Sequence, residues 1–293
     1  MRVRYFVTVV LVMLPFLAGA ASGGPPFGGN EVFRFTDPDI VESSGLVATP
    51  DPLDGLVVTT NDSGDSGRVF TVDVRTGSTV GVTSWPSAPV DVEALAPAGP
   101  GHVWVGDIGD NRAVRDSVEV LRVPVGSRDV AATPTAYELV YPDGARDAEA
   151  LVSHPASGQL FIITKGIFGG TVYAAPPRLR PDRPNRLVEV GEAPGLVTDA
   201  TFLPGGGGVV MRTYDQAYIV DFPSWLGVTS WDLPAQDQGE GVAVGPDGLL
   251  LSTEGARSKV MSVPLPPEAR AVDLRGAAWT ALRWLAAARG VPL

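Results

Sequence analysis

The stretch EGVAVGPDG, residues 240–248, places a carboxylate before a short apolar strand and a Pro/Gly turn after it. Proline fixes φ and glycine accepts positive φ, so this turn is typical of a β-hairpin. Four other units in the chain have the same order of anchor, apolar strand and turn. The five anchors are Ser44, Glu93, Glu149, Asp199 and Glu240. They are 49, 56, 50 and 41 residues apart, the range of four-stranded propeller blades.

Further apolar strands follow each turn, as in LLLSTE at 249–254 and SKVMSVPL at 258–265. Four units have a recognisable fourth strand, and the last unit lacks one. EVFRFTD, residues 31–37, stands alone before the first anchor and can supply the missing outer strand, which would close the ring. We therefore predict an all-β fold, a five-bladed β-propeller over 31–266. A two-sheet sandwich is the alternative, but it gives no reason for a fivefold anchor.

The two ends of the chain lie outside this repeat. Residues 1–20 contain Arg2 and Arg4, then an apolar run and small residues, which is the layout of a secretory signal peptide. A flexible linker is expected over 21–30, and a C-terminal amphipathic helix over 267–293. The predicted apolar face of that helix consists of Ala278, Ala281, Leu282, Leu285 and Ala288. We expect a secreted, extracellular protein without a membrane span.

Composition limits the chemistry and the partners. The 293 residues contain no cysteine, which excludes disulfides, thiolate nucleophiles and iron–sulfur clusters. Without Arg2 and Arg4, 20 basic residues face 33 acidic ones, a net charge of −13. Such a charge disfavours nucleic acid and anionic membranes as partners. We expect a monomer that binds a small anionic molecule, a carbohydrate or an extracellular protein.

The five anchors predict a cation site. The innermost strand of each propeller blade begins near the central channel, so equivalent anchors converge around one axis. Carboxylates about 4 Å apart repel by roughly 4 kcal/mol at an effective dielectric constant near 20. Ca²⁺ would compensate this charge, because it accepts six to eight oxygen ligands, and it fits better than Mg²⁺. Zinc is disfavoured, since His102 and His154 are the only imidazoles. The alternative is that the anchors cap backbone groups or face a water-filled channel.

The same anchors carry a resemblance. Three motifs resemble the blade-starting motifs of the calcium-activated nucleotidases (apyrases): ESSGL at 42–46, EAL at 93–95 and at 149–151, and EGV at 240–242. That family consists of five-bladed propellers that hold a central Ca²⁺ with one Ser or Glu per blade. Asp199 departs from the pattern, standing where the family has serine. NDSG, DIGDN, EAL and QGEG, in this order, are also similar to a group of secreted bacterial propeller proteins of unsettled activity. The resemblance implies the fold and Ca²⁺ more than nucleotide hydrolysis, since the nucleotidases' long insertions are missing.

Polar residues follow the second strands and should return to the same face as the anchors, forming a funnel. The predicted ligand-binding residues are Asn61, Asp62, Asp107, Asn111, Lys165, Arg212, Tyr214 and Glu254. Lys165 and Arg212 are suited to hold a phosphate or carboxylate. The alternative for NDSGDSG and DIGDN is purely local, because Asp and Asn form Asx-turns and glycine supplies positive φ.

Three functions remain open on the sequence alone. The first is a binding module with a central cation and a polar funnel. The second is a Ca²⁺-dependent hydrolase of a phosphorylated or other anionic substrate, in which one carboxylate, Glu149 among them, activates water. The catalytic candidates are Asp62, Asp107, Lys165, Arg212 and Glu254. The third is a glycosidase, which needs two carboxyl groups about 5 to 9.5 Å apart.

Overall fold

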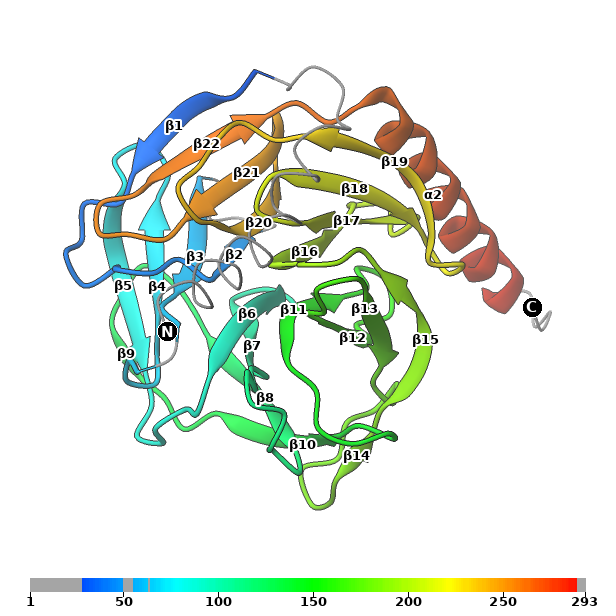
Figure 1. The fold of residues 1–293 in the computed structure, drawn as a ribbon, viewed down its shortest axis with the longest axis horizontal. Helices are drawn as coiled ribbons and strands as arrows, with labels where there is room; N and C mark the ends of the chain where they lie inside the picture. Colours follow the sequence, from blue (N-terminus) through cyan, green and yellow to red (C-terminus); the bar gives the residue numbers. More distant parts are fainter. Residues whose placement is uncertain (1–27, 50–54, 63, 289–293) are drawn as a thin grey trace, which may run out of the picture.

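The computed structural model describes residues 28–49, 55–62 and 64–288, with side chains up to Ala278. The predicted signal peptide and most of the predicted linker lie outside the described residues. Five sheets are arranged in a ring, which confirms the five-bladed propeller (Figure 1). Among the helices of the described residues, none combines the length and the apolar character that a membrane span needs.

Each blade begins with its innermost strand. Blade 1 contains β2 (Gly45–Ala48), β3 (Leu56–Thr60), β4 (Arg68–Asp73), β5 (Ser78–Ser84) and β9 (Val130–Ala131). Blade 2 contains β6 (Val92–Pro97), β7 (His102–Asp107), β8 (Val118–Pro124), β10 (Thr135–Val140) and β14 (Asn185–Arg186). Blade 3 contains β11 (Ala148–Ser153), β12 (Leu160–Thr164), β13 (Gly170–Ala174) and β15 (Val188–Ala193). Blade 4 contains β16 (Asp199–Phe202), β17 (Gly208–Arg212), β18 (Gln216–Asp221) and β19 (Leu226–Asp232). Blade 5 contains β20 (Gly239–Gly245), β21 (Gly248–Thr253), β22 (Lys259–Val263) and β1 (Asn30–Arg34).

The N-terminal strand closes the ring. β1 pairs antiparallel with β22, from Asn30 opposite Ser262 to Arg34 opposite Lys259. It begins at Asn30, inside the predicted linker. Phe33 and Phe35 are buried in the cluster shared by blades 5 and 1, with their rings 5.4 Å apart. The closing strand predicted from EVFRFTD is therefore confirmed.

Deletion of residues 31–37 is expected to produce dimers and larger aggregates. The deletion leaves the backbone N–H and C=O groups of β22 unpaired at a sheet edge and exposes the surface that Phe33 and Phe35 cover. Size-exclusion chromatography checks this, with Val32→Ala as the control because Val32 is exposed. A monomeric deletion variant with an unchanged melting temperature would contradict the role of β1.

Two short strands were not predicted. β9 pairs parallel with β5, and β14 pairs parallel with β10, so each is a segment that reaches back to the preceding blade. The Asn185 side chain fixes β14 by donating to the carbonyl of Glu138 at 2.9 Å. These strands cover the outer edges of blades 1 and 2, which limits edge-to-edge association.

The hydrophobic core lies between the blades. It consists of five clusters, each formed by the facing sheets of two neighbouring blades, such as Val120 with Ile162 in blades 2 and 3. No charged side chain belongs to these clusters. The packing fixes the inner strands, and with them the start of each strand at the channel.

The C-terminal helix α2 (Pro267–Ala288) runs along blade 4 (Figure 1). Ala269 and Val272 are its buried residues, and Asp273 accepts the Gly205 N–H at 2.6 Å. A Cβ at Gly276 would collide with the backbone of Gly207, so this close approach requires glycine. The helix is confirmed, but Ala278 is exposed and its predicted packing is wrong, because the first turns make the contact. The predicted contacts of Ala281, Leu282, Leu285 and Ala288 lie outside the described side chains.

Candidate cation site at the mouth of the central channel

Three of the five anchors lie at a β-bulge in the innermost strand of their blade. The ladder register shifts at Glu93 in β6, at Glu149 in β11 and at Glu240 in β20. Such a β-bulge adds one residue to a strand and redirects its side chain. All three glutamates are 5% exposed. The starts of the inner strands thus bring buried carboxylates to one end of the channel, which we call the mouth.

The other two anchors differ. Ser44 is buried just before β2 and lies outside any bulge. Asp199 is fully buried, and its carboxylate accepts the N–H groups of Ala200 at 2.8 Å and of Val242 in β20 at 2.7 Å. Burial raises the pKa of Asp199 well above its ordinary value. Asp199 thus connects blades 4 and 5 as a backbone cap. Binding of one ion by all five anchors stays a prediction.

A group of three carboxylates lies at the mouth, to one side of the predicted ring. Asp62, Asp91 and Glu93 each offer one oxygen, and the three oxygens lie within 4.8 Å of one another. Asp62 follows β3, whereas Asp91 directly precedes β6. Asp91 was not among the predicted site residues. The signal was present, because Asp-x-Glu-Ala-Leu occurs both at 91–95 and at 147–151.

Glu93 is the most deeply placed member of this group. It makes no hydrogen bond or ion pair with the rest of the described chain. Burial, together with the charges of Glu149, Asp62 and Asp91, raises the pKa of Glu93 to about 11. Burial and the charges of Asp62 and Asp147 raise the pKa of Asp91 to about 6. These groups are costly to ionise together and gain from a positive charge between them.

Glu149 has a partner within the protein. Lys165, which follows β12, donates from Nζ to Glu149 Oε1 at 2.8 Å and to the Tyr214 hydroxyl at 3.0 Å. The ammonium also lies 5.4 Å from the centre of the Tyr214 ring. Burial raises the pKa of Glu149 to about 7, although Lys165 opposes that rise. Burial favours the neutral form of Lys165, but Glu149 and Tyr214 more than offset this and its pKa lies above its ordinary value.

Glu240 and Glu254 form a carboxyl pair at the mouth. Gln238 donates from Nε2 to Glu254 Oε1 at 2.5 Å, and the charge of Glu254 is one of those that act on Glu240. Burial, and next the charge of Glu149, raises the pKa of Glu240 to about 8. With this pKa, Glu240 is able to take up or release a proton near neutral pH.

Arg212 does not face the mouth. It is fully buried, and its Nη1 donates to the carbonyls of Gly241 at 2.7 Å and Ser252 at 2.8 Å, while Nη2 donates to Gln236 Oε1 at 2.5 Å. A Cβ at Gly239 would collide with this guanidinium. Burial lowers the pKa of Arg212 to about 10, although nearby carboxylates oppose it. The expectation of a solvent-facing Arg212 is wrong, because its side chain extends into the space between blades 4 and 5.

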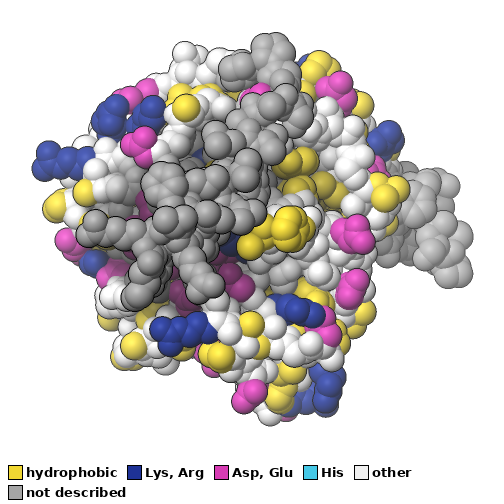
Figure 2. Space-filling view, in the orientation of Figure 1, with side chains coloured by type: hydrophobic (Ala, Val, Ile, Leu, Met, Phe, Trp, Pro, Cys, Tyr) yellow, Lys and Arg dark blue, Asp and Glu magenta, His cyan; other side chains and the backbone are white. Residues whose placement is uncertain are grey.

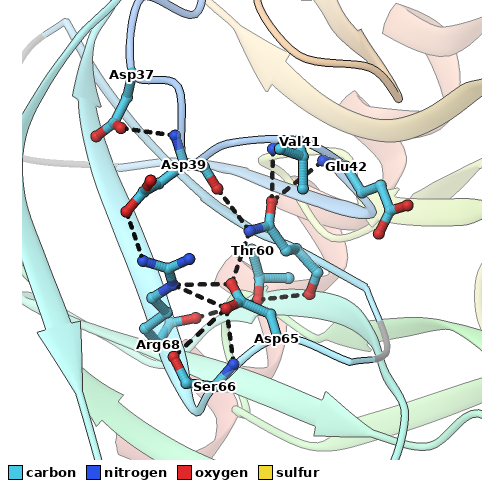
Figure 3. Close-up of polar contacts among 9 residues, drawn as sticks. Asp37, Asp39, Val41, Glu42, Thr60, Asp65, Ser66 and Arg68 are labelled. Carbon is cyan, nitrogen blue, oxygen red and sulfur yellow. Dashed lines mark hydrogen bonds and ion pairs between the residues drawn. The ribbon is translucent and has the colours of Figure 1, made fainter.

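Asn61 holds the loop before β2. Its Oδ1 accepts the N–H groups of Val41 at 3.0 Å and Glu42 at 3.2 Å, and its Nδ2 donates to Asp65 at 2.7 Å. Arg68 bridges Asp65 and Asp39, and Figure 3 shows Glu42 pointing away from these contacts. The local interpretation of NDSGDSG fits Asp65, which accepts the N–H of Ser66, but not Asn61, whose contacts with Val41 and Glu42 join residues 20 and 19 positions apart.

The DIGDN segment supports Asp91 in a similar way. Asp107 is buried, accepts the N–H groups of Val90 at 2.8 Å and Asp91 at 3.0 Å, and pairs with Arg115 at 2.8 Å. Asn111, in contrast, is exposed. Asp107 thus acts on the mouth through the backbone of Asp91.

Both histidines lie at the other end of the channel. His102 begins β7, and His154 follows β11 and packs on Phe202 with ring centres 5.1 Å apart. Acidic side chains gather toward the middle of the face shown in Figure 2. Neither imidazole therefore lies at the mouth.

Without added cations, the protein is expected to become less stable from pH 5 to pH 8. Glu149 and Glu240 have folded-state pKa values of about 7 and 8, above their ordinary value, so the folded state holds more protons than the unfolded state across this range. Stability therefore falls as pH rises. Each pKa unit is worth about 1.4 kcal/mol, so the loss is on the order of several kcal/mol. Urea melts in chelator check this, and stability that rises with pH would contradict it.

The comparisons with known proteins show the fold. No protein-family model matches this chain, and no curated protein matches it either. Among solved structures, Myxococcus xanthus glutaminyl cyclase is similar at 12% identity, with 82% of this chain and 99% of that chain covered and a TM-score of 0.50. A glucose dehydrogenase is similar at 12% identity, with 82% and 100% covered and a TM-score of 0.48. Kuenenia stuttgartiensis hydrazine synthase is similar at 17% identity, with 73% of this chain and 56% of that chain covered and a TM-score of 0.42.

At these identities the likeness concerns the propeller fold alone, which hosts many activities. The chain is a five-bladed propeller with enzyme-bearing structural neighbours. The resemblance to the calcium-activated nucleotidases has no matching family model and stays a prediction.

Proposed function

We propose that this protein is an exported binding module whose channel mouth holds Ca²⁺ through Asp62, Asp91 and Glu93. The observation that carries the proposal is the convergence of these three carboxylates around Glu93, which is buried and makes no hydrogen bond or ion pair with the residues that the structure describes. A cation would supply the missing positive charge and replace the proton on Glu93. The signal peptide expected at 1–20 supports export.

The donor set favours Ca²⁺ over other ions. Every group within reach is an oxygen, which suits hard cations and disfavours zinc. Ca²⁺ accepts more ligands and looser geometry than Mg²⁺. Three carboxylates leave further positions on the ion for a ligand's oxygen. An anionic molecule or a carbohydrate would complete the shell, and Ca²⁺ would offset the repulsion between an anion and this acidic chain.

Ca²⁺ is expected to raise the melting temperature of chelator-treated protein. At a hundredfold excess over Kd, binding to the folded state adds about 2.7 kcal/mol, or about 5 to 10 °C for a domain of this size. Differential scanning fluorimetry checks this, with Mg²⁺ expected to restore less and K⁺ nothing. Equal melting temperatures in chelator and in Ca²⁺ would overturn the proposal.

A Ca²⁺-dependent hydrolase is the second candidate. It is favoured by carboxyl groups with pKa values near neutrality, Glu149 at about 7 and Glu240 at about 8, beside the proposed cation. The Glu149–Lys165–Tyr214 contact would position a proton donor at the same mouth. A screen of phosphate esters with and without Ca²⁺ separates the two functions. Turnover that requires Ca²⁺ favours the hydrolase, and binding without turnover favours the module.

A further inference from the structure

A cavity lies at the end of the channel opposite the mouth. It has a volume of about 630 Å³, within the range of small-molecule sites. The inner strands start at the acidic mouth, so their last residues meet at the opposite end. The walls there include Ala48, Pro97, Ser153 and Val244. Phe202, the last residue of β16, lies there too, so all five blades contribute the end of an inner strand to this cavity.

The walls of this cavity are apolar, whereas the mouth is acidic. The chain carries 55 charged residues, yet among the residues that the structure describes no Asp, Glu, Lys or Arg lines the cavity. Its walls are aliphatic and aromatic, and they include Trp104 and Phe202. Trp104 is only partly buried and its indole packs 5.6 Å from the Tyr137 ring. Apolar surface facing water is unfavourable, which is the condition that an apolar ligand relieves.

Two hydroxyl groups supply polarity. Ser153 in blade 3 and Thr201 in blade 4 line the cavity, and neither side chain makes a hydrogen bond with the described part of the chain. Both are only partly buried. His154 is a fixed wall, since its Nδ1 accepts the Ser157 N–H at 3.2 Å and its ring packs on Phe202. The two hydroxyls are therefore the groups left to orient a ligand.

The cavity is chemically separated from the mouth. Leu46, Leu95 and Leu151 each stand two residues after an anchor, are buried, and border the cavity. A ligand at the far end therefore meets leucine side chains before any carboxylate. A cation would bind at the mouth, and an anion would find no positive group in the cavity.

We propose that this cavity binds an uncharged, largely apolar small molecule that carries an aromatic ring and a hydroxyl or carbonyl oxygen. The ring packs on Trp104 and Phe202, and the oxygen hydrogen-bonds Ser153 and Thr201. This site does not depend on the cation at the mouth.

The test uses 1-naphthol as the probe and naphthalene-1-sulfonate as its charged counterpart, in isothermal titration calorimetry on the full chain. Wild type is expected to bind one 1-naphthol, with the same affinity in Ca²⁺ and in chelator, and to bind the sulfonate at least tenfold more weakly. Thr201→Val, which removes one hydroxyl, is expected to weaken 1-naphthol binding about five- to tenfold.

Filling the cavity gives the second arm. Thr201→Trp and Ser153→Trp are each expected to abolish 1-naphthol binding, whereas Thr135→Trp, at the exposed first residue of β10, leaves it unchanged. Circular dichroism checks that each variant is folded. Two cavity-filling variants are used so that the test still works if one of them does not fold. Absence of one-to-one binding, equal binding of the sulfonate, or full binding by a folded filling variant would overturn the proposal.

Discussion

Replacing Arg212 with alanine is expected to lower the free energy of unfolding by about 3 to 5 kcal/mol, which corresponds to about 6 to 20 °C in melting temperature. The guanidinium is fully buried and donates to Gly241, Ser252 and Gln236. Its removal takes one donor from each of these acceptors and removes the positive charge next to Asp199 and Glu240. Breaking one side of a buried charged network is costly because the remaining groups stay desolvated.

Arg122→Ala is the matched control for this measurement. Arg122 also lies on a strand, β8, but it is exposed and donates only to the Ala98 carbonyl at 3.0 Å. Its replacement should change stability by no more than about 0.5 kcal/mol. A melting temperature of Arg212→Ala within 2 °C of wild type would show that the network adds little stability.

Glu93→Gln is expected to abolish the stabilisation by Ca²⁺ without lowering the stability of the chelated protein. The amide keeps the shape of the carboxyl and replaces a group that has no hydrogen-bond or ion-pair partner in the described part of the chain. At pH 8 the chelated variant should melt close to the chelated wild type, because the pKa of Glu93 is about 11 and the amide therefore replaces a carboxyl that is already neutral. Thermal melts at pH 8, with and without Ca²⁺, check both parts.

Glu149→Gln is its matched control, with the same substitution at the equivalent bulge of the next blade. Here the change removes the ion-pair partner of Lys165, so the chelated variant should melt several degrees lower. The Ca²⁺ response should persist. Loss of the Ca²⁺ response in Glu149→Gln but not in Glu93→Gln would favour a different set of ligands.

The fold was predictable because its signals are local. Each blade repeats an anchor, an apolar strand and a Pro/Gly turn, and EVFRFTD is the one strand left to close the ring. The strands β9 and β14 were missed because each has two residues, too few to show a period.

The site was only partly predictable, because burial and pairing depend on neighbouring blades. Arg212 looks like a funnel residue at a strand end, yet its burial is decided by the packing of β17 against β20. The Lys165–Glu149 contact joins residues on neighbouring strands, which sequence spacing does not reveal. Asp91 could have been found from the repeated Asp-x-Glu-Ala-Leu.

The most direct test of the cation site is calorimetric titration of chelator-treated protein with Ca²⁺, in two buffers with different enthalpies of ionisation. We predict one Ca²⁺ per chain and a buffer-dependent heat, because the ion displaces the proton that Glu93 holds at neutral pH. Glu93→Gln should give no binding heat. Absence of heat with the wild type, or wild-type binding by Glu93→Gln, would contradict a Ca²⁺ site at Asp62, Asp91 and Glu93.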